Sequence, residues 1–161
     1  MPEDDDYVAV ALYREEGRWQ ADALPERIAG DLDALTATLR QQQGELGGIG
    51  LVDIAGEFFV ALRVRGDDQR VLLSDVTAAA AWDLARQVVQ QLDQPMPGDD
   101  DMDDVFPTGD LSIFADLGID EMELGAVLSD TELYADEMLA FIAQRLGFAE
   151  PYERALDGAM G

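Results

Sequence analysis

Residues 58–65 read Phe58-Phe59-Val60-Ala61-Leu62-Arg63-Val64-Arg65, a run rich in aromatic and β-branched side chains. Such a run favours a β-strand, and turn signals flank it at Ala55-Gly56-Glu57 and at Gly66-Asp67-Asp68. Because successive side chains of a strand point to opposite faces, Arg63 and Arg65 share one face. We expect the end of the face that carries these two arginines to be exposed to solvent.

Four further stretches carry strand signals. Residues 49–54 precede the central run and residues 70–74 follow it, which predicts three consecutive strands. Nearer the start of the chain, residues 7–13 form a second β-rich run, and residues 18–23 around Trp19 can pair back on it as a hairpin.

Two helices are predicted between and after these strands. Residues 31–44 place three leucines on one helical face: Leu32, Leu35 and Leu39. A second helix is expected from Asp75 or Thr77, either of which can cap it, to about residue 92. Its expected inner side chains are Ala81, Leu84, Val88 and Leu92. The order ββαβββα predicts an α+β fold with an antiparallel sheet covered by helices, and longin- and roadblock-like domains share that order.

The second half of the chain is more acidic than the first. Residues 1–92 carry 17 acidic and 8 basic side chains, whereas residues 93–161 carry 18 and 2. Prolines, a glycine and a run of aspartates between residues 94 and 104 disfavour a packed element. We therefore expect an α+β domain at residues 1–92, a mobile acidic linker at 93–109 and a subdomain of short helices at 110–161.

Four short helices are predicted in that last part. Residues 110–117 form the first, and Asp120 caps the second, at 122–128, with Glu123 as its acidic third position. The third covers residues 131–146, with inward side chains at Met138, Leu139, Ile142 and Leu146. Pro151 suits the first turn of the last helix, at 152–156. Helices this short do not persist alone, so they must pack together or against the sheet.

The chain contains no histidine, no cysteine and no lysine. It therefore has no side chain whose unperturbed pKa lies near 7, no Ser-His or Cys-His nucleophile pair, and no zinc or iron site of the Cys/His type. A catalytic or phosphate-binding lysine is excluded as well. We expect no catalytic residue, no cofactor and no metal, and the residue chemistry favours an interaction protein over an enzyme.

The formal net charge of the 161 residues is -25. A field of this sign repels nucleic-acid phosphate and anionic lipid and attracts basic surfaces, although it also serves solubility alone. The acidic N-terminus lacks the features of a signal peptide, and no apolar run approaches the length of a bilayer span. We expect a cytoplasmic protein that binds neither nucleic acid nor membrane directly.

An aspartate run is the candidate surface for a basic partner: Asp99, Asp100, Asp101, Asp103 and Asp104. Its alternate spacing resembles a calcium-binding loop. However, Asp104 replaces the required glycine, Asp110 stands at the position of the terminal glutamate, and Pro107 interrupts the loop. The run therefore favours weak attraction of cations and basic proteins over a specific calcium site.

The second half also carries a family resemblance, most specifically in Val105-Phe106-Pro107-Thr108-Gly109-Asp110-Leu111-Ser112-Ile113-Phe114-Ala115-Asp116-Leu117-Gly118. With Leu146-Gly147-Phe148-Ala149 and residues 58–64 and 73–79, it resembles the actinobacterial family of tRNA adenosine deaminase-associated proteins. The resemblance implies association with the gene for the enzyme that converts adenosine to inosine in tRNA. It does not imply deaminase activity, because a zinc deaminase needs histidine and cysteine ligands.

Three hypotheses follow. The first is a non-catalytic cytoplasmic accessory protein that binds a basic protein, with a tRNA adenosine deaminase as the candidate partner. The second is an acidic mimic of nucleic acid that inhibits nucleic-acid-binding proteins. The third is a sensor of a small ligand or a divalent cation, based on the order of the elements and on the aspartate run.

Overall fold

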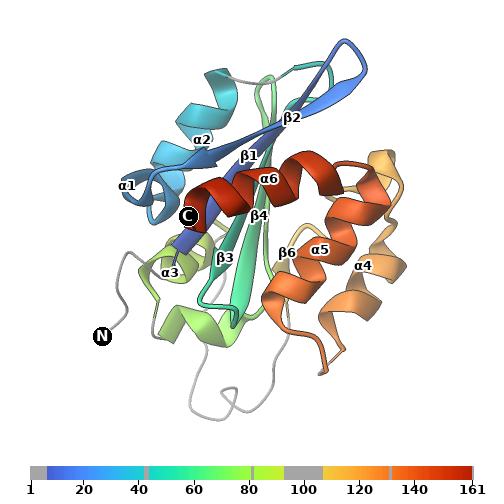
Figure 1. Ribbon diagram of the computed structural model, residues 1–161. Coiled ribbons are helices and arrows are strands. Elements are labelled where there is room, and N and C mark those ends of the chain that lie inside the picture. The colour runs from blue at the N-terminus through green and yellow to red at the C-terminus, as the bar shows by residue number, and fades with distance from the viewer. Residues whose placement is uncertain (1–6, 42–43, 81, 93–106, 131, 161) are drawn as a thin grey trace.

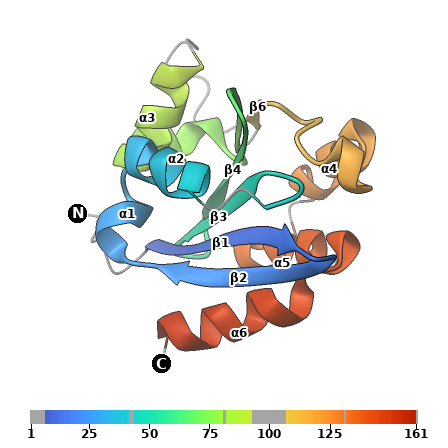
Figure 2. The ribbon, with the colours of Figure 1, turned by 90° about the horizontal axis from the view of Figure 1, so that it is seen from above.

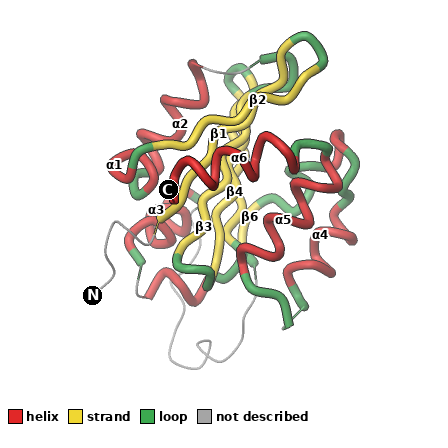
Figure 3. The backbone as a smooth tube through the Cα atoms, viewed as in Figure 1, coloured by secondary structure: helices red, strands yellow, loops and turns green. Residues whose placement is uncertain are grey.

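The computed structural model describes residues 7–41, 44–80, 82–92, 107–130 and 132–160. An antiparallel sheet runs through its centre in the order β2-β1-β3-β4-β5-β6 (Figure 3). Its strands are β1 (Tyr7–Glu15), β2 (Arg18–Leu24), β3 (Gly48–Ile54), β4 (Phe58–Arg65), β5 (Asp68–Leu73) and β6 (Thr108–Gly109). The predicted α+β fold and the five predicted strands are confirmed.

Helices cover both faces of the sheet (Figures 1 and 2). The face that we call the N-terminal face packs against α1 (Glu26–Ala29), α2 (Leu32–Gln41), the 3-10 helix η2 (Val76–Ala80) and α3 (Asp83–Gln91). The opposite face, the C-terminal face, packs against residues 111–156, which contain the 3-10 helix η4 (Ala115–Leu117), α4 (Glu121–Leu128), α5 (Ala135–Leu146) and most of α6 (Ala149–Met160).

The sequence of β4 shows why two layers of helices are needed. Val60, Leu62 and Val64 belong to the hydrophobic cluster of the N-terminal face, whereas Phe59 and Ala61 belong to that of the C-terminal face. A strand that is apolar on both faces must be covered on both. The C-terminal helices supply the second cover. Of the two arrangements expected for such short helices, packing together or packing against the sheet, the structure shows that they pack against the sheet.

The chain reaches the C-terminal face through β6. Thr108 and Gly109 pair with Leu73 and Leu72 of β5, a strand that the sequence did not indicate. Gly109 has φ +115°, and a Cβ there would lie 2.3 Å from the carbonyl oxygen of Val71, so only glycine fits. The linker predicted at 93–109 lies outside the described residues up to residue 106, and its last residues form this edge strand.

The prediction of one helix from Asp75 or Thr77 to residue 92 is wrong. Asp75 accepts hydrogen bonds from the backbone N–H and the hydroxyl of Thr77, and this turn begins η2. Trp82 is then extended, with φ -115° and ψ 129°, and α3 begins after it. The extended backbone lets the indole pack edge-on against Tyr7 and Phe58, so tertiary packing interrupts the helix.

The C-terminal helices also differ from prediction. Residues 110–117 form turns and η4 instead of a helix, because Asp110 accepts hydrogen bonds from the backbone N–H and the hydroxyl of Ser112. Helix α5 begins at Ala135, not at 131, and α6 is longer than predicted. By contrast, Asp120 caps α4 as predicted and accepts a hydrogen bond from the Glu123 N–H at 2.8 Å.

Candidate functional site

Arg63 is a buried cation near the end of β4. Its side chain is only 4% exposed, so the prediction that this end of the face is solvated is wrong for Arg63. The guanidinium donates hydrogen bonds to both carboxylate oxygens of Asp116 and to the carbonyl oxygens of Ile113 and Leu46, each of the latter at 3.0 Å. Residues 110–118 lie over the strand end and exclude water from it. The pattern of side chains along β4 alone could not indicate this cover, because it comes from a distant part of the sequence.

Asp116 is the anionic partner of this arginine and remains 43% exposed. Hydrogen bonds from Arg63 hold the pKa of the Asp116 carboxyl below its usual range. Burial opposes the shift, and the charges of Arg63 and Arg65 add to it. The carboxylate is therefore ionised at neutral pH and neutralises a cation that would otherwise be costly to bury.

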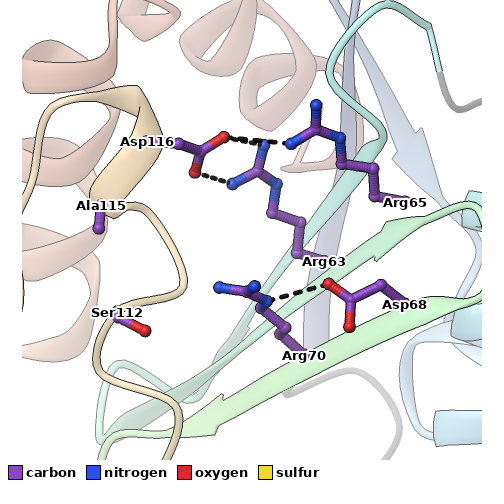
Figure 4. Close-up of a pocket in the computed structure, with 7 residues that line it drawn as sticks. All are labelled: Arg63, Arg65, Asp68, Arg70, Ser112, Ala115 and Asp116. Carbon is purple, nitrogen blue, oxygen red and sulfur yellow. Dashed lines mark hydrogen bonds and ion pairs between the residues drawn. The ribbon is translucent and has the colours of Figure 1, made fainter.

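Two more arginines surround this pair. Arg65 lies 3.6 Å from Asp116, and Arg70 lies 3.1 Å from Asp68 and 3.5 Å from Asp110. Their side chains are 59% and 42% exposed. Figure 4 shows the guanidinium groups of both arginines and of Arg63 around a common space between β4, β5 and the loop that carries Ser112 and Asp116.

That space is a cavity of about 230 Å³, which we call the arginine pocket. Its lining residues are Arg63, Arg65, Asp68, Arg70, Ser112, Ala115 and Asp116. Sequence reasoning did not identify it. The available signal was the register of the hairpin: Arg63 pairs directly with Arg70, and like charges opposite each other in a sheet are unfavourable unless something neutralises them.

A second polar surface surrounds α4 and α5, and we call residues 120–137 the α4–α5 region. The sequence has no basic residue there, and its exposed acidic side chains are Asp120, Glu121, Asp130, Glu132, Asp136 and Glu137. Two large apolar side chains are also exposed, Met122 at 86% and Tyr134 at 70%. Met and Tyr are enriched at protein interfaces.

A cavity of about 210 Å³ adjoins this region. Its apolar walls are Leu128, Leu133 and Met138, and its carboxylates are Glu57, Asp75 and Asp130. Within the described residues, no three acidic side chains gather closely enough to hold a metal ion. Separated carboxylates around an apolar wall suit a long basic side chain, whose stem packs while its charged end stays near the carboxylates.

The structure does not describe the aspartates that were predicted to face a partner. Asp99, Asp100, Asp101, Asp103 and Asp104 lie outside the described residues, so their role stays a prediction. In the part of the chain that the structure does describe, no helix is long and apolar enough to cross a membrane.

Comparison with known proteins identifies the family. The sequence model of the family described as Rv3753c-like tRNA adenosine deaminase-associated protein matches residues 7–149, which include the whole sheet, the arginine pocket and the α4–α5 region. Protein Rv3753c of Mycobacterium tuberculosis (strain ATCC 25618 / H37Rv) is 39% identical over 153 residues, covering 94% of this chain and 88% of that protein. No solved structure is a significant match. The chain belongs to the family of Rv3753c-like tRNA adenosine deaminase-associated proteins.

Proposed function

We propose that this chain is a non-catalytic accessory protein of the cytoplasm that binds a tRNA adenosine deaminase. The observation that carries the proposal is the family match over residues 7–149, whose description names association with that enzyme. The chain itself has no histidine or cysteine to hold the zinc ion that activates water in such deaminases. Chemistry on adenosine would therefore belong to the partner.

The α4–α5 region is the proposed docking surface. A tRNA-binding enzyme needs basic side chains for phosphate contacts, and an acidic surface attracts such side chains from a distance. Met122 and Tyr134 supply apolar contact area among these charges, and the cavity beside Leu128 can hold a basic side chain of the partner. We propose that the aspartate run of residues 99–104 adds to the same attraction.

The test is to measure binding between this chain and the tRNA adenosine deaminase of the same organism by surface plasmon resonance at several salt concentrations. We expect a complex whose association slows as salt rises, because exposed charges are screened within ~8 Å at physiological ionic strength. If no complex forms at even the lowest salt concentration, the proposal is refuted. Inosine formation by the purified chain alone would refute its non-catalytic part.

Two matched variants locate the surface. Glu121→Gln, Asp130→Asn and Glu132→Gln together remove three charges from the α4–α5 region, whereas the matched control, Glu15→Gln, Asp33→Asn and Asp67→Asn, removes three exposed charges elsewhere. We expect the first variant to slow association about threefold or more and the control to have little effect. Equal effects would show that only net charge matters.

Replacing Asp99, Asp100, Asp101, Asp103 and Asp104 together by Asn tests the aspartate run in the same assay. We expect slower association at low salt and an unchanged thermal midpoint. An unchanged association rate would remove these residues from the proposed surface.

The formal charge of -25 also supports a second candidate, a mimic of nucleic acid that inhibits nucleic-acid-binding proteins. A panel of purified RNA-binding proteins separates the two proposals. Tight binding to the deaminase alone favours the accessory protein, and comparable binding across the panel favours the mimic.

A further inference from the structure

The arginine pocket gathers arginines, with the carboxylates of Asp68 and Asp116 in the same lining, in a chain that has few basic side chains. Three of the ten arginines line this one cavity, although acidic side chains outnumber basic ones by 35 to 10. Arg63 and Arg65 share one face of β4, and Arg70 lies directly opposite Arg63 on β5. Since like charges in such positions repel one another, the cluster is unfavourable without anions around it.

The structural ion pair requires only Arg63. Both oxygens of Asp116 accept hydrogen bonds from Arg63, and two backbone carbonyls fix the guanidinium further. The Nε of Arg63 is buried without a hydrogen-bond partner, so the fixed guanidinium retains one unsatisfied donor. Arg65 and Arg70 make only longer ion-pair contacts with the loop that covers β4.

The Nε of Arg70 already donates a hydrogen bond to Asp68 at 3.1 Å, but the other anionic contacts of the two outer arginines are long. Arg65 lies 3.6 Å from Asp116, and the Nη1 atom of Arg70 lies 3.5 Å from Asp110. Charge-assisted hydrogen bonds between a guanidinium and an oxyanion are shorter, about 2.7–2.9 Å. An anion between Arg65 and Arg70 could replace both long contacts with short ones.

The size and charge of the pocket select the class of anion. A volume of about 230 Å³ lies below the ~300–1,000 Å³ of sites for drug-sized ligands, so the pocket fits a small group. A single carboxylate offers one charge, whereas a phosphate monoester carries about -1.5 to -2 and three acceptor oxygens. Three guanidinium groups, of which the two outer ones are partly exposed, offer more hydrogen-bond donors than one carboxylate can accept, so they match the phosphate better.

We infer that the arginine pocket binds a small phosphate-bearing anion, with Arg65 and Arg70 contacting the phosphate oxygens beside the fixed guanidinium of Arg63. Ser112 also lines the pocket, but its hydroxyl already donates a hydrogen bond to Asp110. Nucleic acid is disfavoured as the source of the phosphate, because the net charge of the chain repels a polyanion. This inference does not depend on the proposed deaminase partner.

The experiment measures binding of inorganic phosphate to the full chain by phosphorus NMR titration and by thermal unfolding, with chloride adjusted to constant ionic strength. We expect saturable binding, and a midpoint about 3–6 °C higher at a phosphate concentration tenfold above the dissociation constant. The double variant Arg65→Gln and Arg70→Gln should lose at least about tenfold in affinity, since each bidentate contact to an anion is strong.

The matched control is Arg27→Gln with Arg154→Gln, which removes two exposed arginines outside the pocket lining and changes net charge equally. It should retain phosphate binding, and circular dichroism should show that both double variants fold. Glycerol 3-phosphate distinguishes the source: tighter binding than inorganic phosphate indicates a phosphorylated metabolite, and equal binding indicates free phosphate. The inference is overturned if phosphate does not bind saturably, if acetate binds equally well, or if both double variants lose binding alike.

Discussion

The N-terminal face of the sheet is covered by helices from the same half of the chain, and the C-terminal face is covered by a segment that follows much later. The cover of the N-terminal face is mainly apolar. Among its polar contacts, the neutral amide of Gln87 accepts a hydrogen bond from the Leu32 N–H at 2.8 Å and donates one to the Gly30 carbonyl at 3.1 Å. The C-terminal face adds ion pairs: Arg63–Asp116, Arg65–Asp116, Arg70–Asp110 and Arg145–Glu123. Acid should therefore weaken the C-terminal face selectively.

Each face contains one tryptophan, which makes the comparison measurable. Trp82 packs against Phe58 on the N-terminal face at a ring distance of 5.8 Å, and Trp19 packs against Phe148 on the C-terminal face at 5.0 Å. Trp19→Phe leaves Trp82 as the fluorescent reporter of the first face, and Trp82→Phe leaves Trp19 as the reporter of the second.

The largest expected effect is that of Phe148→Ala, which removes a fully buried ring from the C-terminal face. It should lower the free energy of unfolding by about 3–5 kcal/mol, through lost burial and the cavity left behind. Urea unfolding in the Trp19→Phe background measures it. If the two faces unfold as one unit, Trp82 on the far face reports the full loss; an unchanged Trp82 transition would show that the two faces unfold separately.

The next effect is that of Asp116→Asn, which leaves the buried guanidinium of Arg63 without a counter-charge. We expect a loss of about 1–3 kcal/mol, below the cost for a fully buried pair because Asp116 is partly exposed. Urea unfolding at neutral pH measures it, and the exposed Asp67→Asn is the matched control. Equal stability of the two variants would show that the carbonyls of Ile113 and Leu46 alone can hold Arg63.

The same contrast explains how much the sequence predicted. Strands β1 to β5 were predictable because their apolar runs are bounded by local turn signals, and Leu84 and Val88 were predicted on the inner face of α3 from helical spacing. The arginine pocket was not, because Asp116 lies 53 residues from Arg63 in sequence and only the fold brings them together.

Long-range contacts also decide local structure in the C-terminal segment. Residues 110–117 have helical spacing, yet the Ile113 carbonyl accepts a hydrogen bond from Arg63 instead of serving a helix. Similarly, the Tyr134 N–H donates to the side chain of Glu137 at 3.1 Å, which marks the start of α5 after the residue predicted from the pattern.

A third prediction concerns acid. Hydrogen bonds from Arg63 and Arg145 lower the pKa values of Asp116 and Glu123 in the folded state. Their contributions to stability are complete above the unfolded values of about 3.9 and 4.3 and are lost as pH falls through the lower folded values. Below about pH 4, Trp19 fluorescence should therefore change at a higher pH than Trp82 fluorescence. Coincident transitions would mean that the ion pairs do not distinguish the faces.

The smallest expected effect comes from a carboxylate that opposes the packing of the C-terminal face. Burial raises the pKa of Asp53, the hydrogen bond from the Gly56 N–H lowers it, and the charge of Asp136 raises it. Burial also raises the pKa of Tyr152, with the charges of Asp53 and Asp136 adding to the shift. The ionised Asp53 is therefore unfavourable where the helices meet the sheet.

Asp53→Asn should relieve that cost, because the amide oxygen can still accept the hydrogen bond from Gly56 while the charge is removed. A raised pKa means that the folded state binds the proton more tightly than the unfolded state, so the carboxylate lowers stability above the unfolded value and has no effect below it. We expect a gain of less than about 1 kcal/mol at neutral pH, a rise in the thermal midpoint of about 1–3 °C. The gain should vanish below about pH 3.9, and Asp67→Asn, at an exposed position, should show none. A gain that persists in acid would arise from packing, and charge would then not be what limits the stability of the C-terminal face.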